Sequence, residues 1–164
     1  IVHRLDRATS GVMIAAKNQA AQTYLQKQFA DKKVLKKYTA IVVGTPEPAE
    51  AHIIAALLRN QSIPQQFKVD QAGKHAETIY KVEASVGGVS KVTLTPLTGR
   101  THQLRIHMQY IGHSIVGDHL YGSEIGEERL YLHAHTLQIR VPGGELHTFE
   151  APLPDSFEER LRRG

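Results

Sequence analysis

The chain has 164 residues, with 20 Lys and Arg against 16 Asp and Glu, which gives a formal net charge of +4. This length fits one domain with its own core, and the small positive charge suits an anionic partner without identifying one. The absence of cysteine excludes a disulfide framework and any thiolate metal site, and no apolar run approaches the roughly 18 residues of a membrane span.

The first half of the chain predicts strands flanking one helix. A short apolar strand is expected over Val12 to Ala16, after a turn at Gly11. Asn18 is placed to cap a helix that runs to about Lys33, and a strand should follow over Val34 to Gly44. The proline-rich residues 45–48 end that strand. Residues 50–75 are poorly patterned and predict an insertion over the sheet, with an edge strand near Ala51 to Leu57.

The second half predicts a hairpin, a helix, two more strands and a final helix. The hairpin joins Glu77 to Ala84 with Ser90 to Leu94 across Gly87-Gly88. Apolar residues at helical spacing run from Thr101 to Ile111, and Gly112 closes that helix. Leu130 to Val141 alternates as a strand and turns at Gly143-Gly144 into Glu145 to Glu150. Asp155, with Glu158 three residues later, resembles a capping box that starts the last helix.

Because strands are joined both by hairpins and by helices, we expect an α+β fold. Its sheet should be mixed and largely antiparallel, with flanking helices packed on it. Residues 1–164 contain no linker or repeat, so we expect one catalytic domain. The chain begins with Ile1 rather than Met, immediately before its most informative motif, and we interpret it as a fragment truncated at its N-terminus.

The most informative motif is His3-Arg4-Leu5-Asp6-Arg7, which is followed by Thr9-Ser10-Gly11. A guanidinium close to a carboxylate favours the charged form of the carboxylate. An ionised carboxylate can serve as a nucleophile or general base, and arginine also matches the geometry of phosphate. The alternative is a surface loop with ordinary ion pairs, which are common and weak.

Further motifs occur in a fixed order along the chain. They comprise Lys37-Tyr38, the run Gly99-Arg100-Thr101-His102-Gln103-Leu104-Arg105-Ile106-His107, Gly112-His113-Ser114-Ile115-Val116-Gly117-Asp118 with Leu120-Tyr121-Gly122, Leu132-His133-Ala134-His135, and Ala151-Pro152-Leu153-Pro154. Together with the opening motif, this series resembles the RluA-type RNA pseudouridine synthases over nearly the whole chain. Two positions depart from the family pattern: Ser114 replaces a common proline, and Gln138 lies where a His-Pro pair is frequent.

The resemblance implies a catalytic domain that converts specific uridines in structured RNA, either ribosomal or transfer RNA, to pseudouridine. It implies a bent mixed sheet whose cleft holds the nucleophile, with no cofactor and no metal. By resemblance Asp6 is the nucleophile and Arg100 pairs with it, holding the carboxylate ionised and aimed. We further expect a cytoplasmic protein, acting as a monomer. The alternatives for Arg100 are a structural ion pair and a phosphate contact.

Other candidate residues each have a structural alternative. Tyr38 shares a strand face with Lys36 and Ala40. Without the resemblance it would be interpreted as a core residue. The family match implies that it stacks on the target uracil, and it could also accept the C5 proton. A phenol with a pKa near 10 is a poor base at neutral pH. Arg4 is expected to fill the space left by an extruded base or to contact phosphate, or else to pair with Asp6.

Three further assignments also have a structural alternative. Leu132 forms the apolar floor beneath the uracil by resemblance, and is otherwise a core residue. The basic run Lys32, Lys33, Lys36 and Lys37 is equally a solvated face and a path for phosphates. Arg105 is at least as well explained by a nearby carboxylate as by RNA.

Two rival functions remain from the sequence. The first is an RNA-binding module that has lost activity, which the presence of Asp6, Tyr38 and Arg100 disfavours. The second is a metal-dependent hydrolase using some of the ten histidines, such as the His133 and His135 pair. The chain lacks a His-Glu-x-x-His spacing, which disfavours the hydrolase.

Overall fold

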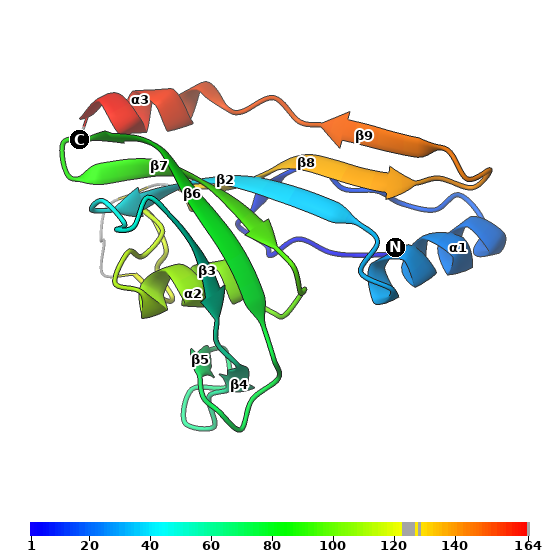
Figure 1. Ribbon diagram of the computed structural model, residues 1–164, viewed down its shortest axis with the longest axis horizontal. Helices are drawn as coiled ribbons and strands as arrows, with labels where there is room; N and C mark the ends of the chain where they lie inside the picture. Colours follow the sequence, from blue (N-terminus) through cyan, green and yellow to red (C-terminus); the bar gives the residue numbers. More distant parts are fainter. Residues whose placement is uncertain (123–126, 128, 164) are drawn as a thin grey trace.

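The computed structural model describes residues 1–122, 127 and 129–163, and Figure 1 shows its sheet with a helix on either side. The helices are α1 (Gln19–Ala30), α2 (Gln103–Tyr110) and α3 (Asp155–Arg163). The strands are β1 (Ser10–Gly11), β2 (Leu35–Val43), β3 (Glu50–Ile54), β4 (Leu57–Arg59), β5 (Phe67–Val69), β6 (Glu77–Val86), β7 (Val89–Pro96), β8 (Leu132–Arg140) and β9 (Leu146–Glu150).

The main sheet is mixed and largely antiparallel, which confirms the expected α+β class. Its order among the described residues is β1-β8-β2-β7-β6-β3, with β9 also paired to β8. Of the strands in the described residues, only β1 runs parallel to its neighbour, through Ser10 opposite His133 and Gly11 opposite Ala134. The two long central strands, β2 and β7, pair in register from Tyr38 opposite Leu94 to Val43 opposite Val89. The sheet therefore brings the N-terminal residues next to β8, which lies near the other end of the chain.

Alternate residues of β2 contribute to different cores, because side chains alternate across a strand. Ala40 and Val42 pack in the cluster that includes Leu104 and Met108 of α2. Ile41, between them, packs instead with Phe157 of α3. In Figure 1, α2 lies on one side of the sheet and α3 on the other. The two faces of β2 are thus covered by different helices, and the α2 side carries the site.

The helix α1 begins where the sequence indicates. The Asn18 side chain accepts a hydrogen bond from the backbone N–H of Ala21, which is the usual function of an N-cap. The helix ends at Ala30, earlier than the expected Lys33, and Lys32 has a left-handed backbone with φ 56°. Leu25 packs this helix against Leu137 and Ile139 of β8. No helix among the described residues is both long enough and apolar enough to cross a membrane.

The expected strand over Val12 to Ala16 is wrong. Only Ser10–Gly11 pairs as β1, and Val12, Ile14 and Ala16 pack against the α1 cluster instead. Their alternation reflects burial under a helix rather than a hydrogen-bonded ladder. The insertion of residues 50–75 supplies the predicted edge strand as β3, while β4 and β5 form a separate two-stranded sheet.

Candidate active site

A cavity of about 730 Å³ lies between the N-terminal segment, β2 and the turn that leads from β7 into α2. All five site residues expected from the sequence line this cavity; they are Arg4, Asp6, Tyr38, Arg100 and Leu132. Their positions in the chain are up to 128 residues apart, so the fold brings them together. What differs from expectation is how these side chains pair.

Asp6 is held by a turn and by the pairing of β1. The backbone N–H of Thr9 donates to the Asp6 carbonyl at 2.9 Å, and the chain then joins β8 through Ser10 and Gly11. At Gly11, where φ is +121°, a Cβ would lie 2.2 Å from the Ala134 carbonyl oxygen. Only glycine permits this close approach. The Thr-Ser-Gly turn therefore fixes the segment that carries Asp6 against the sheet.

Arg105 is the arginine nearest the Asp6 carboxylate, with Nη1 3.8 Å from Oδ2. The Arg105 side chain also makes two hydrogen bonds of 2.7 Å to the two carboxylate oxygens of Asp118. Burial would raise the pKa of Asp118, but hydrogen bonds and charge from Arg105 outweigh it and hold that pKa below its ordinary value. Asp118 is thus a buried anion that fixes the guanidinium which faces Asp6.

Asp118 is itself fixed by the loop around it. The backbone N–H groups of Leu120 and Tyr121 donate to its Oδ1, each at 3.0 Å. The Tyr121 ring lies 5.0 Å from the Arg105 guanidinium carbon, in cation–π contact. The Gly-Asp-x-x-Tyr portion of the sequence therefore orients Arg105, which explains why this motif belongs to the site although it does not line the cavity.

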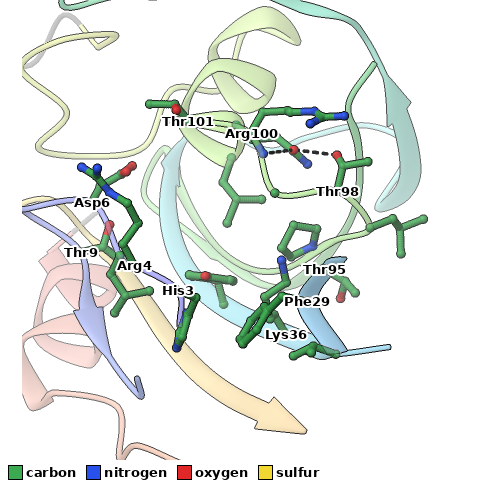
Figure 2. A pocket seen from close by; sticks show the side chains of 18 of the residues that line it. His3, Arg4, Asp6, Thr9, Phe29, Lys36, Thr95, Thr98, Arg100 and Thr101 are labelled. Carbon is green, nitrogen blue, oxygen red and sulfur yellow. Dashed lines mark hydrogen bonds between the residues drawn. The ribbon is translucent and has the colours of Figure 1, made fainter. Parts of the chain in front are cut away.

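The expected pairing of Arg100 with Asp6 is not found. The Nε of Arg100 donates to the His75 carbonyl oxygen at 2.9 Å, and Figure 2 shows its guanidinium directed away from Asp6. The helix begins at Gln103, two residues later than expected, so Arg100 lies in the preceding turn. Arg105, which the sequence suggested as a partner of some carboxylate, takes the position beside Asp6.

The turn that carries Arg100 is fixed by Gln103, which is buried. Its Oε1 accepts from the Arg100 backbone N–H at 3.0 Å and from the Thr98 hydroxyl at 2.7 Å. Its Nε2 donates to the Glu77 carbonyl at 2.8 Å. This network attaches the turn to β6, so the glutamine of Gly-Arg-Thr-His-Gln is a structural residue.

His102 is a site residue that the sequence reasoning did not assign. Its Nε2 lies 4.0 Å from Asp6 Oδ1, and its Nδ1 hydrogen-bonds to the Tyr121 hydroxyl at 2.7 Å. Burial lowers its pKa, more than the Asp6 charge raises it. Its backbone is left-handed with φ 54°, a costly conformation in a non-glycine residue and one that clusters at functional sites.

Tyr38 lines the cavity from β2, on the face shared with Lys36. Burial, together with the Asp6 charge, raises the pKa of Tyr38 to about 12. The phenol is therefore protonated throughout the neutral range. A protonated ring held in this position is suited to stacking and is a poor acceptor of a proton.

Of the remaining two expected residues, Leu132 is buried and Arg4 is exposed. Leu132 is 3% exposed and packs in the core beneath the cavity, opposite Ala40 in the sheet register. Arg4 is exposed, and its charge contributes to the lowered pKa of His102, which places Arg4 near the same end. The position of Leu132 fits an apolar floor beneath a base, and the exposed position of Arg4 at the rim fits contact with an extruded nucleotide or a phosphate.

The closest contacts of Asp6 are electrostatic rather than hydrogen-bonded. In the described part of the chain, its carboxylate accepts no hydrogen bond and lies 3.8 Å and 4.0 Å from Arg105 and His102. Its side chain is 22% exposed. The carboxylate oxygens are thus close to two cationic or titratable side chains yet open to a molecule in the cavity.

Comparison with known families agrees with this geometry. The RNA pseudouridylate synthase family model matches residues 1–110. The chain belongs to that family. The match covers the segments that carry Asp6, Tyr38 and Arg105, and the family resemblance noted in the sequence is therefore confirmed.

Relatives are similar over most of the chain. It is 39% identical to the ribosomal large subunit pseudouridine synthase C of Escherichia coli K12, covering 99% of this chain and 55% of that protein. The chain therefore spans about half the length of such relatives. It is 43% identical to the dual-specificity RNA pseudouridine synthase RluA of the same organism, covering 92% of this chain and 72% of that one.

Solved structures share the fold. Human RNA pseudouridylate synthase domain containing 1 superposes with a TM-score of 0.85 at 33% identity, covering 92% of this chain and 67% of that one. Human RNA pseudouridylate synthase domain containing 4 gives a TM-score of 0.82 at 27% identity, covering 98% and 73%.

Proposed function

We propose that this protein isomerises uridines in structured RNA to pseudouridine, with Asp6 as the nucleophile. The observation that carries the proposal is the Asp6 carboxylate, which lies 3.8 Å from a buried arginine, accepts no hydrogen bond from the described residues and faces a cavity of about 730 Å³. The family to which the chain belongs supports the same reaction.

The product of the reaction is an isomer of the substrate, so the composition does not change although one proton is exchanged. The bond between N1 and C1′ breaks, the uracil turns, and a bond forms between C5 and C1′. The proton on C5 leaves to a base, and N1 gains a proton. No oxidant, water or phosphoryl donor is consumed, so the residues of the cavity need only supply a nucleophile, hold the detached base and transfer protons.

The chain supplies these functions from separate elements. Asp6 reacts at the target nucleoside, and Arg105 holds its charge while being held in turn by Asp118. Tyr38 stacks on the uracil above the Leu132 floor, and Arg4 at the rim enters the space that the extruded base leaves. Arg100, turned away from Asp6, contributes through RNA contact. The charged residues Asp6 and Arg105 therefore lie at one end of the cavity, and the apolar Leu132 lies beneath the uracil.

The substrate that we propose is ribosomal or transfer RNA, because relatives named for the large ribosomal subunit and for dual RNA specificity both match most of the chain. We infer further that the protein acts in the cytoplasm, where these RNAs are modified, as a monomer without a cofactor. Asp6, Tyr38 and Arg105 all lie on one chain, which supports action by a single copy.

The test is release of tritium from C5-labelled uridine in total RNA taken from cells that lack the gene. The purified protein should release tritium, since the C5 hydrogen leaves during isomerisation, and a chelator should not change the rate. Mapping pseudouridine in cells with and without the gene identifies the target. A folded protein that binds RNA but releases no tritium overturns the proposal in favour of a binding module.

A further inference from the structure

The cavity extends well beyond Asp6, toward the loop between α1 and β2. Residues at this second end include His3, Phe29, Lys36 and Gly99, and Figure 2 shows His3, Phe29 and Lys36 gathered on the side away from Asp6 and Thr101. We name these four residues the Lys36 subsite. None of them acts in the isomerisation as proposed above, so their common position requires another explanation.

Lys36 is a cation without a counter-ion. Its ammonium makes no hydrogen bond or ion pair with any residue in 1–122, 127 or 129–163, although Lys33, three residues earlier, pairs with Asp31 at 3.3 Å. Burial lowers the pKa of Lys36, because a desolvated ammonium that lacks an anion is less stable in its charged form. An anion in the cavity would remove that penalty.

Gly99 lies next to this ammonium. A Cβ built on Gly99 would be in ordinary van der Waals contact with Lys36 Nζ, at 3.6 Å, so the glycine leaves this side of the ammonium without a side-chain neighbour at that position. Gly99 begins the turn that Gln103 attaches to β6. The glycine therefore leaves the charge accessible at a fixed distance from a fixed turn.

Beside Lys36 lies an aromatic wall that carries no charge. The rings of His3 and Phe29 are stacked, with centroids 4.6 Å apart and planes inclined by 19°. The Nε2 of His3 accepts the backbone N–H of Ile14 at 3.0 Å, and burial together with the Lys36 charge lowers the His3 pKa. The imidazole is thus neutral, and Lys36 is the cation beside this wall; Lys32 and Lys33 line the cavity from the preceding loop.

The distance to the reacting residues suits an adjacent nucleotide. Lys36 and Tyr38 lie two residues apart on one face of β2, which corresponds to ~7 Å along a strand. This is the scale of one step along a polynucleotide. A base stacked on Tyr38 would therefore carry its neighbouring linkage past Lys36.

We propose that the Lys36 subsite binds the nucleotide next to the target uridine, with Lys36 holding its phosphate and the His3–Phe29 wall contacting its sugar and base. This inference rests on the proposed function, since it assigns the target uridine to the Asp6 end. It names single-stranded RNA flanking the extruded base as the ligand of the second end.

The test compares Lys36→Met with Lys81→Met by retention of total RNA on filters across a range of salt concentrations. Lys81 is exposed on β6 and does not line the cavity, so both variants lose one strand lysine. Loss of one phosphate contact should reduce the slope of log affinity against log salt by about 0.7. We expect Lys36→Met to show this change with about tenfold weaker binding, Lys81→Met to keep the native slope, and Lys36→Arg to restore it.

A second arm separates this inference from the proposed function. In tritium release, Lys36→Met should raise KM and leave kcat within about threefold, because a phosphate contact that exists before and during the reaction contributes uniform binding. Phe29→Leu, which keeps the apolar packing, should also raise KM. An unchanged salt slope in folded Lys36→Met overturns the subsite even if native protein is active. Native protein that releases no tritium overturns the proposed function and the assignment of the target uridine, whereas the filter measurement still decides whether Lys36 binds an RNA phosphate.

Discussion

The two ends of the cavity differ in how their charged side chains are paired. At the Asp6 end, Asp6, Arg105 and Asp118 form a chain of paired charges in which Arg105 and Asp118 are nearly inaccessible. At the Lys36 end, the Lys36 ammonium has no anionic partner among the described residues and lies beside the stacked rings of His3 and Phe29. Paired charges are fixed before substrate arrives, as catalysis requires, whereas an unpaired charge gains its partner when substrate binds. Under the two proposals above, this difference separates the residues that we expect to react from those that we expect to retain RNA.

The largest expected effect is at Asp6. Asp6→Asn keeps the shape of the side chain but removes the anion, so we expect tritium release to be abolished. RNA affinity should stay within about tenfold of native, because the phosphate contacts that dominate affinity lie elsewhere. The two measurements are made on the same preparation. Turnover by the folded variant would remove Asp6 from the role of nucleophile.

Arg105 gives the next largest effect. Arg105→Met should lower kcat by about 10²- to 10³-fold, the usual range for loss of one fixed electrostatic group. It also leaves Asp118 buried without its partner, which should reduce the free energy of unfolding by about 3–5 kcal/mol. Turnover is followed by tritium release and stability by urea denaturation.

A double variant separates these two effects of Arg105. In Arg105→Met with Asp118→Leu, both buried charges are gone, so most of the lost stability should return while kcat stays low. If the double variant recovers kcat together with stability, Arg105 acts only in folding and the pairing with Asp6 has no catalytic role.

The two arginines show where sequence reasoning succeeds and where it fails. The motif places both in one short run, but Arg100 lies in the turn before α2 and Arg105 lies within the helix. Which of them reaches Asp6 depends on where the helix begins, and the left-handed backbone of His102 and the Gln103 network set that point. These are tertiary effects, because Gln103 bonds to β6 and His102 bonds to Tyr121.

Much of the fold was nevertheless accessible from the sequence. The Asn18 cap, the hairpin across Gly87-Gly88 and the edge strand after the proline-rich turn depend on local chemistry, and the structure contains all three. The segment after Gly11 was misassigned because alternation of apolar residues is common to a strand and to an extended segment packed under a helix. The carboxylate Asp118 was recognised only as part of a motif, since its partner lies 13 residues away.

Arg100 should give a smaller effect than Arg105. Its guanidinium is held by the His75 carbonyl rather than by Asp6, and one neutral-acceptor hydrogen bond contributes about 0.5–1.5 kcal/mol. We therefore expect Arg100→Met to lower kcat/KM by at most about tenfold, mainly through KM. Measured beside Arg105→Met, an equal or larger fall in kcat would restore Arg100 to the catalytic position.

The smallest expected effect is a flat pH profile from Tyr38. The Tyr38 pKa is raised to about 12 by burial and by the Asp6 charge, so below pH 10 the phenolate is a very small fraction that grows tenfold with each pH unit. If the phenolate accepted the C5 proton, kcat would rise with unit slope from pH 7.5 to pH 9.5; if Tyr38 only stacks, kcat is unaffected by this ionisation. We expect native protein and Tyr38→Phe to give parallel profiles under single-turnover conditions, and Tyr38→Ala, which removes the ring, to bind substrate less well than Tyr38→Phe. A unit slope in native protein that disappears in Tyr38→Phe would make Tyr38 the base, and the Asp6 end would then supply both the nucleophile and the proton acceptor.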